Sequence, residues 1–119
     1  MANLPNQEPL VESQSFYHKV FKWKEKHTKY CYESDGYLSF SSDGTGYWRC
    51  YTWTDDHESD HVWYCNFSCY SHSGEHLFDT DQCESPPMSY GKKYKWHFDF
   101  EYDPSYYDKI SKVTQYYNC

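Results

Sequence analysis

The feature that most constrains the fold is an alternation of side-chain character between Tyr90 and Tyr102. The even positions carry Tyr, Lys, Tyr, Trp, Phe, Phe and Tyr, whereas all the odd positions but Gly91 carry Lys, His, Asp or Glu. Side chains of a strand point alternately to two faces, so this period of two predicts a long strand with one buried and one wet face.

The core of such a sheet must be built mainly from rings. The 119 residues include 15 Tyr, 7 Phe and 5 Trp, but only four Leu, four Val, one Ile and two Met. This excludes a Leu/Ala helical bundle, and 23% aromatic content argues against a disordered chain. The length suits one domain.

Six cysteines in a chain this short predict a disulfide framework and therefore a secreted protein. No apolar run is long enough to span a membrane, and no apolar block with a cleavage site follows Met1, so we expect any signal peptide to have been removed. The sequon at Asn66 is an expected glycosylation site. The net charge of −7 argues against a nucleic-acid partner.

Residues 1–14 contain two Pro and no aromatic residue, so we expect a flexible tail followed by one β domain over residues 15–119. The segment from Phe16 to Tyr30 is basic. Its rings at odd positions predict a strand, and its lysines are typical of the solvated face of an edge strand.

Cross-strand register can be predicted for the middle of the chain. Residues 37–41 and 47–53 read as a hairpin, and a three-residue loop would place Phe40 opposite Trp48. If Thr54 then pairs with His61 across the acidic turn at residues 55–60, Cys50 faces Cys65, which predicts a Cys50–Cys65 disulfide.

The remaining cysteines complete the expected framework. Cys31–Cys119 would join the two ends of the domain, and Cys69–Cys83 follows by elimination. Residues 71–89 are expected to be an irregular connection, and residues 106–119 a strand or a helical turn followed by a strand. The predicted fold class is all-β: a single antiparallel β-barrel or sandwich stapled by three disulfides.

Several segments resemble known families. Four cysteines follow a ring by two residues, as in the aromatic-x-Cys motif of secreted effector candidates of rust and mildew fungi. The run from Tyr30 to Tyr37, the spacing from Cys50 to Cys65 with Trp63 before it, and residues 96–103 followed by 109–113 resemble the Alternaria major-allergen family. That resemblance implies a secreted fungal β-barrel acting on plants. The spacing of Cys50, Cys65 and Cys69 also resembles tick chemokine-binding evasins.

Two groups could carry chemistry. Cys65, Cys69, His72 and His76 have the spacing of weak zinc-ligand candidates, although an even number of cysteines favours disulfides, so neither a metal nor a cofactor is expected. His97, with Asp99 and Glu101 on the wet strand face, has the residue types of acid–base catalysis, and the surrounding stretch is similar to fungal guanyl-specific ribonucleases. The chain lacks the catalytic Arg and the second His that such a ribonuclease would require after this stretch, so we do not expect an enzyme.

Binding is therefore the expected activity. The rings of Tyr51, Trp53, Tyr64 and Tyr70 fall on the strand face opposite the cysteines and are the candidate binding residues. We expect a secreted virulence effector that binds a host protein, modulates host defence, and could be recognised by a plant immune receptor. The alternatives are a carbohydrate-binding module, an evasin-like chemokine trap and a ribonuclease-like protein.

Overall fold

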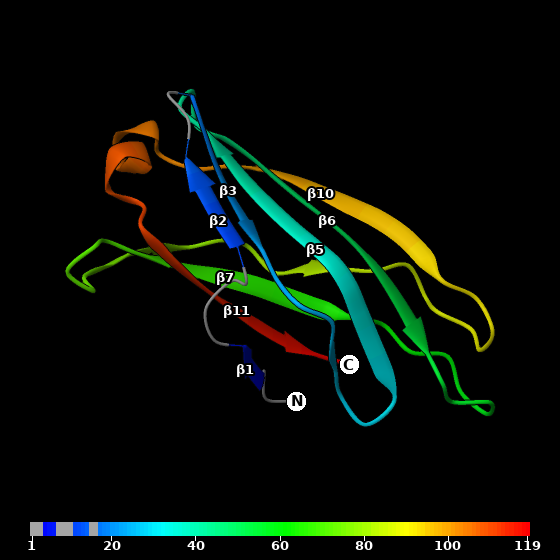
Figure 1. Ribbon diagram of the computed structural model, residues 1–119. Coiled ribbons are helices and arrows are strands. Elements are labelled where there is room, and N and C mark those ends of the chain that lie inside the picture. The colour runs from blue at the N-terminus through cyan, green and yellow to red at the C-terminus, as the bar shows by residue number, and fades with distance from the viewer. Residues whose placement is uncertain (1–3, 7–10, 15–16) are drawn as a thin grey trace.

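The computed structural model describes residues 4–6, 11–14 and 17–119 and consists of two antiparallel sheets (Figure 1). Sheet A has the order β1 (Leu4–Asn6), β11 (Lys112–Asn118), β7 (Tyr64–Tyr70) and β8 (His76–Asp79), and β9 (Cys83–Glu84) also pairs with β7. Sheet B has the order β10 (Tyr94–Glu101), β6 (Thr45–Thr54), β5 (Cys31–Ser41), β3 (His18–Lys22) and β2 (Val11–Gln14), and β4 (Lys26–His27) also pairs with β5. A 3-10 helix, η1 (Pro104–Lys109), links β10 to β11.

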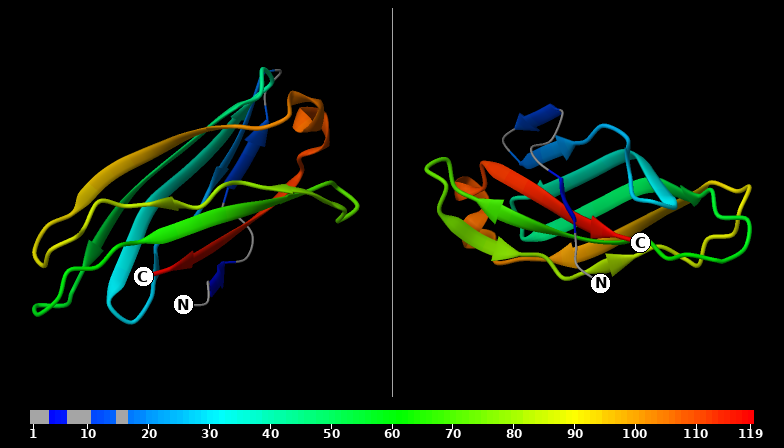
Figure 2. Two further views of the ribbon diagram at one scale, coloured as in Figure 1. Left: turned by 180° about the vertical axis from the view of Figure 1, so that it is seen from behind. Right: turned by 90° about the horizontal axis from the view of Figure 1, so that it is seen from below.

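The all-β prediction is confirmed, and of the two predicted architectures the molecule has the sandwich. Within the described part of the chain, no strand ladder joins sheet A to sheet B, so the sheets do not close into a barrel. Figure 2 shows the two layers from behind and from below. None of the described helices has the length and apolar character needed to cross a membrane.

The segment predicted as a flexible tail contains two paired strands. Residues 4–6 form β1 against β11 of sheet A, and residues 11–14 form β2 against β3 of sheet B. These two segments therefore have regular structure. The sequence did not predict it, because backbone hydrogen bonds to the edge of a sheet do not require an alternating apolar pattern. The rest of the predicted tail, and the predicted domain start near Ser15, lie outside the described residues.

The β5–β6 hairpin forms as predicted, but with a different register. Phe40 lies opposite Gly46 rather than Trp48, and Leu38 lies opposite Trp48. Position 46 must be glycine because the Phe100 ring fills the space beside it. A Cβ at Gly46 would lie 2.2 Å from that ring. The predicted register was chosen because it keeps the apolar side chains on one face, and the observed register, shifted by two residues, keeps them on the same face, so that criterion could not distinguish the two.

The predicted pairing between β6 and β7 is wrong. β6 lies between β5 and β10, and β7 belongs to the other sheet, so residues 55–63 cross from sheet B to sheet A instead of forming a hairpin. The Asp56 carboxylate lies 2.8 Å from His61 Nε2 and accepts from the Glu58 N–H at 2.9 Å. These contacts hold a compact crossover loop.

The strand predicted from Tyr90 to Tyr102 is β10, which is shorter at both ends. Its even side chains turn inward, with Trp96 buried and Phe98 and Phe100 half-buried, while the odd side chains are exposed. The return predicted after Pro104 is also found, as a helical turn followed by a strand. The connection over residues 71–89 was expected to be irregular and contains β8 and β9.

The core is built from rings, as the composition predicts. Trp48 of sheet B packs on Phe67 of sheet A with ring centroids 4.8 Å apart, and Trp23 lies 5.5 Å from Phe67 and 5.9 Å from Trp48. This three-ring contact joins the layers near their middle. Such pairs add about 0.5–1.5 kcal/mol each beyond the area they bury.

Two lysines expected on a solvated edge are instead buried. Lys19 Nζ donates to the main-chain oxygen of Ile110 at 2.8 Å, and burial lowers the Lys19 pKa. Lys26 Nζ lies 3.3 Å from a carboxylate oxygen of Glu33, which is fully buried and accepts from Gln115 Nε2 at 2.7 Å. Burial raises the Glu33 pKa, and Lys26 and Gln115 offset part of that rise. The other lysines of the segment are exposed, as expected.

Candidate functional site

The candidate site is the outer face of sheet B, by which we mean the side chains of β5, β6 and β10, and of Lys93 before β10, that point away from the core. Burial alternates along β5 and β6, and β10 presents its charged residues on the same side. The members that matter here are Tyr32, Tyr37, Tyr47, Arg49, Tyr51, Trp53, Lys93, Lys95, His97, Asp99 and Glu101.

Rings and cations pack on one another across this face. The Arg49 guanidinium lies 4.3 Å from the centroid of the Tyr37 ring, and Lys95 Nζ lies 5.9 Å from that of Tyr51. Cation–π contacts at exposed positions contribute about 0.5–1 kcal/mol each. The contacts therefore preorganise these side chains before a partner arrives.

Trp53 is enclosed by its neighbours. The Tyr32 ring on β5 stacks on it with centroids 5.4 Å apart and planes 8° apart, and Lys93 Nζ lies 4.4 Å from its centroid. Tyr32 approaches from the β5 side of β6 and Lys93 from the β10 side. Neighbours on both sides leave Trp53 poorly placed to stack on a sugar ring.

A β-bulge interrupts β5 beneath this face. The ladder with β6 skips between the pairs Ser34–Tyr51 and Tyr37–Arg49, so Asp35 and Gly36 together oppose Cys50. Asp35 has φ of 56°, a left-handed conformation that non-glycine residues adopt uncommonly. Bulges re-aim side chains and are frequent beside functional sites.

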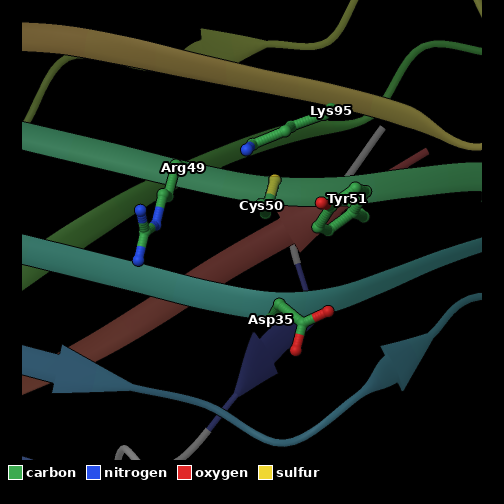
Figure 3. Close-up of a pocket in the computed structure, with 5 residues that line it drawn as sticks. All are labelled: Asp35, Arg49, Cys50, Tyr51 and Lys95. Carbon is green, nitrogen blue, oxygen red and sulfur yellow. The ribbon is translucent and has the colours of Figure 1, made fainter.

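The bulge borders a hollow of about 400 Å³, lined by Asp35, Arg49, Cys50, Tyr51 and Lys95. Figure 3 shows Asp35, Arg49 and Lys95 extending from three neighbouring strands around it. Cys50 itself is buried. Among the ion pairs of the described residues, none involves Arg49 or Lys95, so both charges are available to a partner.

A second hollow, of about 310 Å³, lies farther along the same strands. It is lined by Ser39, Ser41, Thr45, Gly46, Tyr47, Asp99, Phe100 and Glu101. Its charged groups are both acidic, whereas the first hollow has two cations and one acid. The outer face of sheet B therefore has a cationic part and an acidic part.

The four predicted binding residues do not form one surface. Tyr51 and Trp53 lie on the outer face of sheet B, but Tyr64 and Tyr70 are on β7 and face outward from sheet A. Tyr70 contacts the His76 ring, with centroids 5.5 Å apart, and its hydrogen bond with Tyr116 raises the Tyr116 pKa. The shared face was expected because β6 and β7 were treated as neighbours in one sheet, and a binding role for the four residues stays a prediction.

One of the three predicted disulfides is present. Cys31–Cys119 joins the first residue of β5 to the residue after β11 and so cross-links the two sheets. The Cys50–Cys65 and Cys69–Cys83 predictions are wrong: the four thiols are free, and Cys83 lies opposite Cys65 with sulfurs 3.4 Å apart. The Cys50–Cys65 prediction required the two residues to face each other on neighbouring strands, but β6 and β7 belong to different sheets. Cys69 lies opposite Val113 and Phe78, not opposite Cys83. Burial raises the pKa of all three of these thiols.

The zinc candidates do not converge. Cys65 and Cys69 are buried inside the sandwich, whereas His72 and His76 are exposed, and His76 Nε2 lies 2.8 Å from the Asp79 carboxylate. The one metal-ligand cluster found among the described residues is Cys31, His61 and Cys119. Two of its three sulfur and nitrogen donors are consumed by the disulfide.

The acid–base candidates are exposed. His97 Nε2 lies 3.7 Å from the Asp99 carboxylate, with 61% and 74% of the two side chains accessible to solvent. The His97 ring stacks on Tyr47, with centroids 5.7 Å apart. The pair thus belongs to the acidic part of the outer face, where water reaches both groups.

The expected glycosylation position lies on β7 of sheet A. Asn66 is half-buried on the outward side of β7, between the buried Cys65 and Phe67. The predicted orientation toward the outside of the sheet is confirmed, and the modification itself stays a prediction.

Sequence reasoning missed the first hollow altogether. Its signal was the Asp35-Gly36 pair inside an otherwise alternating strand, because an isolated Gly in a strand pattern suggests a bulge. Arg49 and Lys95 alternate with core residues on neighbouring strands, but their proximity depends on the β6–β10 pairing, which no local pattern specifies.

The chain belongs to a protein family described as a family of unknown function, DUF6294, whose model matches residues 37–119. The match begins within β5 and includes β6 and β10, which carry most of the outer face of sheet B. No curated protein and no solved structure matches the chain. The resemblances to the Alternaria allergen family and to evasins stay predictions.

Proposed function

We propose that this protein is a secreted virulence effector that binds a host protein through the outer face of sheet B and thereby modulates host defence. A plant immune receptor that recognises the protein would contact the same half-buried, outward-facing rings. The observation that carries the proposal is the preformed array of rings and unpaired cations around the hollow beside Asp35. Tyr, Trp and Arg are the residues that dominate protein-interface energetics.

Secretion is part of the proposal and is supported by the cross-link between the sheets. A disulfide that joins β5 to the end of β11 requires an oxidising compartment to persist. The six cysteines in 119 residues are in keeping with this.

The carbohydrate-binding alternative is less well supported. Modules of that kind need an accessible ring face, and Tyr32 and Lys93 cover Trp53 from both sides. The ribonuclease-like alternative depends on His97 and Asp99, which are exposed, and His97 lines neither of the two hollows on this face.

The proposal can be tested by affinity capture from plant apoplastic fluid, with animal serum as the control source. Wild type should retain one or a few plant proteins, and a Tyr51→Ala, Arg49→Ala double variant should lose them. The matched control is Tyr64→Ala, Lys112→Ala, which removes the same residue type and one cation from the outer face of sheet A. Loss of capture in the control but not in the first variant would contradict the proposed surface.

A further inference from the structure

We infer that the outer face of sheet B binds an extended segment of the partner protein in which a carboxylate and a cationic side chain lie about four residues apart. The inference rests on the proposed function and names the chemistry of the partner. The carboxylate would occupy the hollow between Arg49 and Lys95, and the cation would lie beside Asp99 and Glu101.

The first hollow has the groups that recognise a carboxylate. The Arg49 guanidinium is held 4.3 Å from the Tyr37 ring, and a planar guanidinium can donate two parallel N–H bonds to a carboxylate. Lys95 approaches from β10 as a second donor, and the Tyr51 ring forms part of the wall. No acidic side chain of the described residues forms an ion pair with either cation.

The backbone at this hollow is locally strained. Asp35 adopts φ of 56°, and Gly36 beside it must lack a side chain because a Cβ would lie 2.7 Å from the buried Trp48 ring. The bulge aims the Asp35 carboxylate outward at the rim, where it can accept from a main-chain N–H of a bound segment. Conformations of this kind persist where the surrounding structure enforces them, and they concentrate at binding sites.

The second hollow has the opposite charge. Asp99 is 74% accessible, and Glu101 lies two residues farther along β10 on the same face. Hydroxyl groups of Ser39, Ser41 and Thr45 line the remainder. A lysine or arginine of the partner would find two carboxylates and several acceptors there.

The spacing of the two hollows fits one extended strand of a partner. Arg49 lies opposite His97, and Thr45 lies opposite Glu101, so the two charge centres are four residues apart along both β6 and β10. Four residues of extended chain span about 13 Å. A partner segment with the same separation between its acidic and basic side chains can engage both hollows at once.

This arrangement favours a protein over a uniform polyanion. An acidic polysaccharide or a nucleic acid would meet Arg49 and Lys95 but would be repelled by Asp99, Glu101 and the net charge of −7. A segment of mixed charge satisfies both parts of the face. Polygalacturonate therefore serves as a test of the competing class of ligand.

The experiment titrates the full-length, isotope-labelled protein with synthetic peptides and follows amide shifts by NMR. The probe is a nine-residue Thr/Ser/Val peptide with one Glu and one Lys four residues apart, and its controls replace Glu by Gln or move Lys to two residues from Glu. We expect the Gln peptide to bind about tenfold more weakly and the displaced Lys to cost a few-fold. Shifts should be confined to β5, β6 and β10.

Matched variants assign the contacts to residues. Arg49→Gln should weaken the Glu/Lys peptide about tenfold while leaving the Gln peptide unchanged, and Glu101→Gln should weaken it a few-fold. Lys112→Gln, which removes an exposed cation from sheet A, should change neither affinity by more than about twofold. Comparison of each variant's amide spectrum with that of the wild type shows whether the variant is folded.

Three outcomes would overturn the inference: no peptide binding at millimolar concentration, tighter binding of polygalacturonate than of the peptide, or concentration-dependent dimerisation through the same face. If host protein is captured in a way that depends on Tyr51 and Arg49 but is insensitive to Glu101→Gln, the proposed function survives and this inference fails. If capture does not depend on the outer face of sheet B at all, the proposed function itself fails.

Discussion

The two ends of the interior hold the same pair of sheets together by different means. At the end that includes the β5–β6 turn, the Phe40 ring meets the rings of Phe78, Phe100 and Tyr102 at centroid distances between 5.4 and 6.3 Å. We call this the ring end. The opposite end contains the Cys31–Cys119 disulfide, the Cys65 and Cys83 thiols, and the buried Glu33 with Lys26 and Gln115. We call it the sulfur end.

The difference shows which parts of this fold depend on conditions. The ring contacts themselves depend neither on redox state nor on protonation, and one titratable group beside them is the buried Lys19, which lies opposite Phe40 with its pKa lowered. At the sulfur end, the sheets are linked by a covalent bond that reduction breaks and by a carboxylate whose pKa is raised by burial. The hollow beside Asp35 lies on β5, β6 and β10, and β5 begins at Cys31 of the disulfide. We therefore expect reduction of the disulfide to change the geometry of this hollow.

The largest expected effect is loss of the disulfide. The bond spans 88 residues, and the chain-entropy model gives about 4–5 kcal/mol for a loop of that size. A Cys31→Ala, Cys119→Ala variant should therefore unfold at a much lower urea concentration than wild type. Hydrogen exchange should accelerate first in β4 and at the start of β5. Cys69→Ala, which removes a buried thiol outside the bridge, is the control, and an equal loss there would contradict the assignment.

Truncation of Phe40 should cost nearly as much, but without condition dependence. Phe40 is fully buried at the ring end, and Phe-to-Ala changes in cores cost about 3–5 kcal/mol. The loss measured by urea unfolding should be the same with and without reductant. Tyr90→Ala, at a ring that is 53% exposed, should cost less than about 1 kcal/mol. A Phe40→Ala loss that appears only in reduced protein would show that the two ends are not separate.

Lys26→Met tests the buried charge at the sulfur end. Removing one partner of a buried pair costs about 3–5 kcal/mol, and we expect the lower value because Glu33 can take up a proton. Lys26 lowers the Glu33 pKa in the wild type, so its loss raises that pKa further above the ordinary 4.5. A raised native pKa stabilises the folded state below the unfolded-state pKa, and this stabilisation is lost as pH rises through the native value.

The loss of stability relative to wild type should therefore be smallest in acid, near pH 4.5, and should grow toward neutral pH. Adding Glu33→Gln should abolish this pH dependence. If the loss of stability in the single variant does not change with pH, Glu33 does not titrate over that range. The sulfur end would then be no more sensitive to pH than the ring end.

The smallest expected effect comes from the opposed thiols of Cys65 and Cys83. In a glutathione redox buffer, we expect these two thiols to form a disulfide as each loses a proton and an electron to glutathione disulfide, which becomes two glutathione molecules. Closing the loop of 18 residues should stabilise by about 3 kcal/mol on the same model. Non-reducing peptide mapping should find Cys65 joined to Cys83, with Cys50 and Cys69 as free thiols. Cys50 joined to Cys65 would contradict the expectation that Cys83 is the partner of Cys65.

The ring end could be predicted from the sequence better than the sulfur end. The alternation of Phe98 and Phe100 with charged residues, and the rings of the β5–β6 hairpin, define inward faces by a local rule. Lys26 and Glu33 could not be assigned to the interior, because each reads as an ordinary charged strand residue until Gln115, 82 residues from Glu33, is known to lie against it.

The candidate site was predictable in kind but not in place. Tyr51 and Trp53 belong to the outer face of sheet B, as an outward ring pattern implied, while Tyr64 and Tyr70 belong to the other sheet. The error came from assuming that strands adjacent in sequence are adjacent in space. Besides β5, the partner strand of β6 is β10, which begins 40 residues after β6 ends, and only the β6–β10 pairing places Lys95 beside Arg49.

The disulfide also determines how this molecule would respond to mechanical force. If the chain were pulled from Met1 and Cys119, the bond to Cys31 would carry the load past β5 to β11, and those strands would bear no tension. Only the segment before Cys31 could lengthen, to about 105 Å when fully extended, compared with about 410 Å for the reduced chain. The oxidised protein would thus give way through β1 to β4 while the outer face of sheet B on β5, β6 and β10 kept its shape.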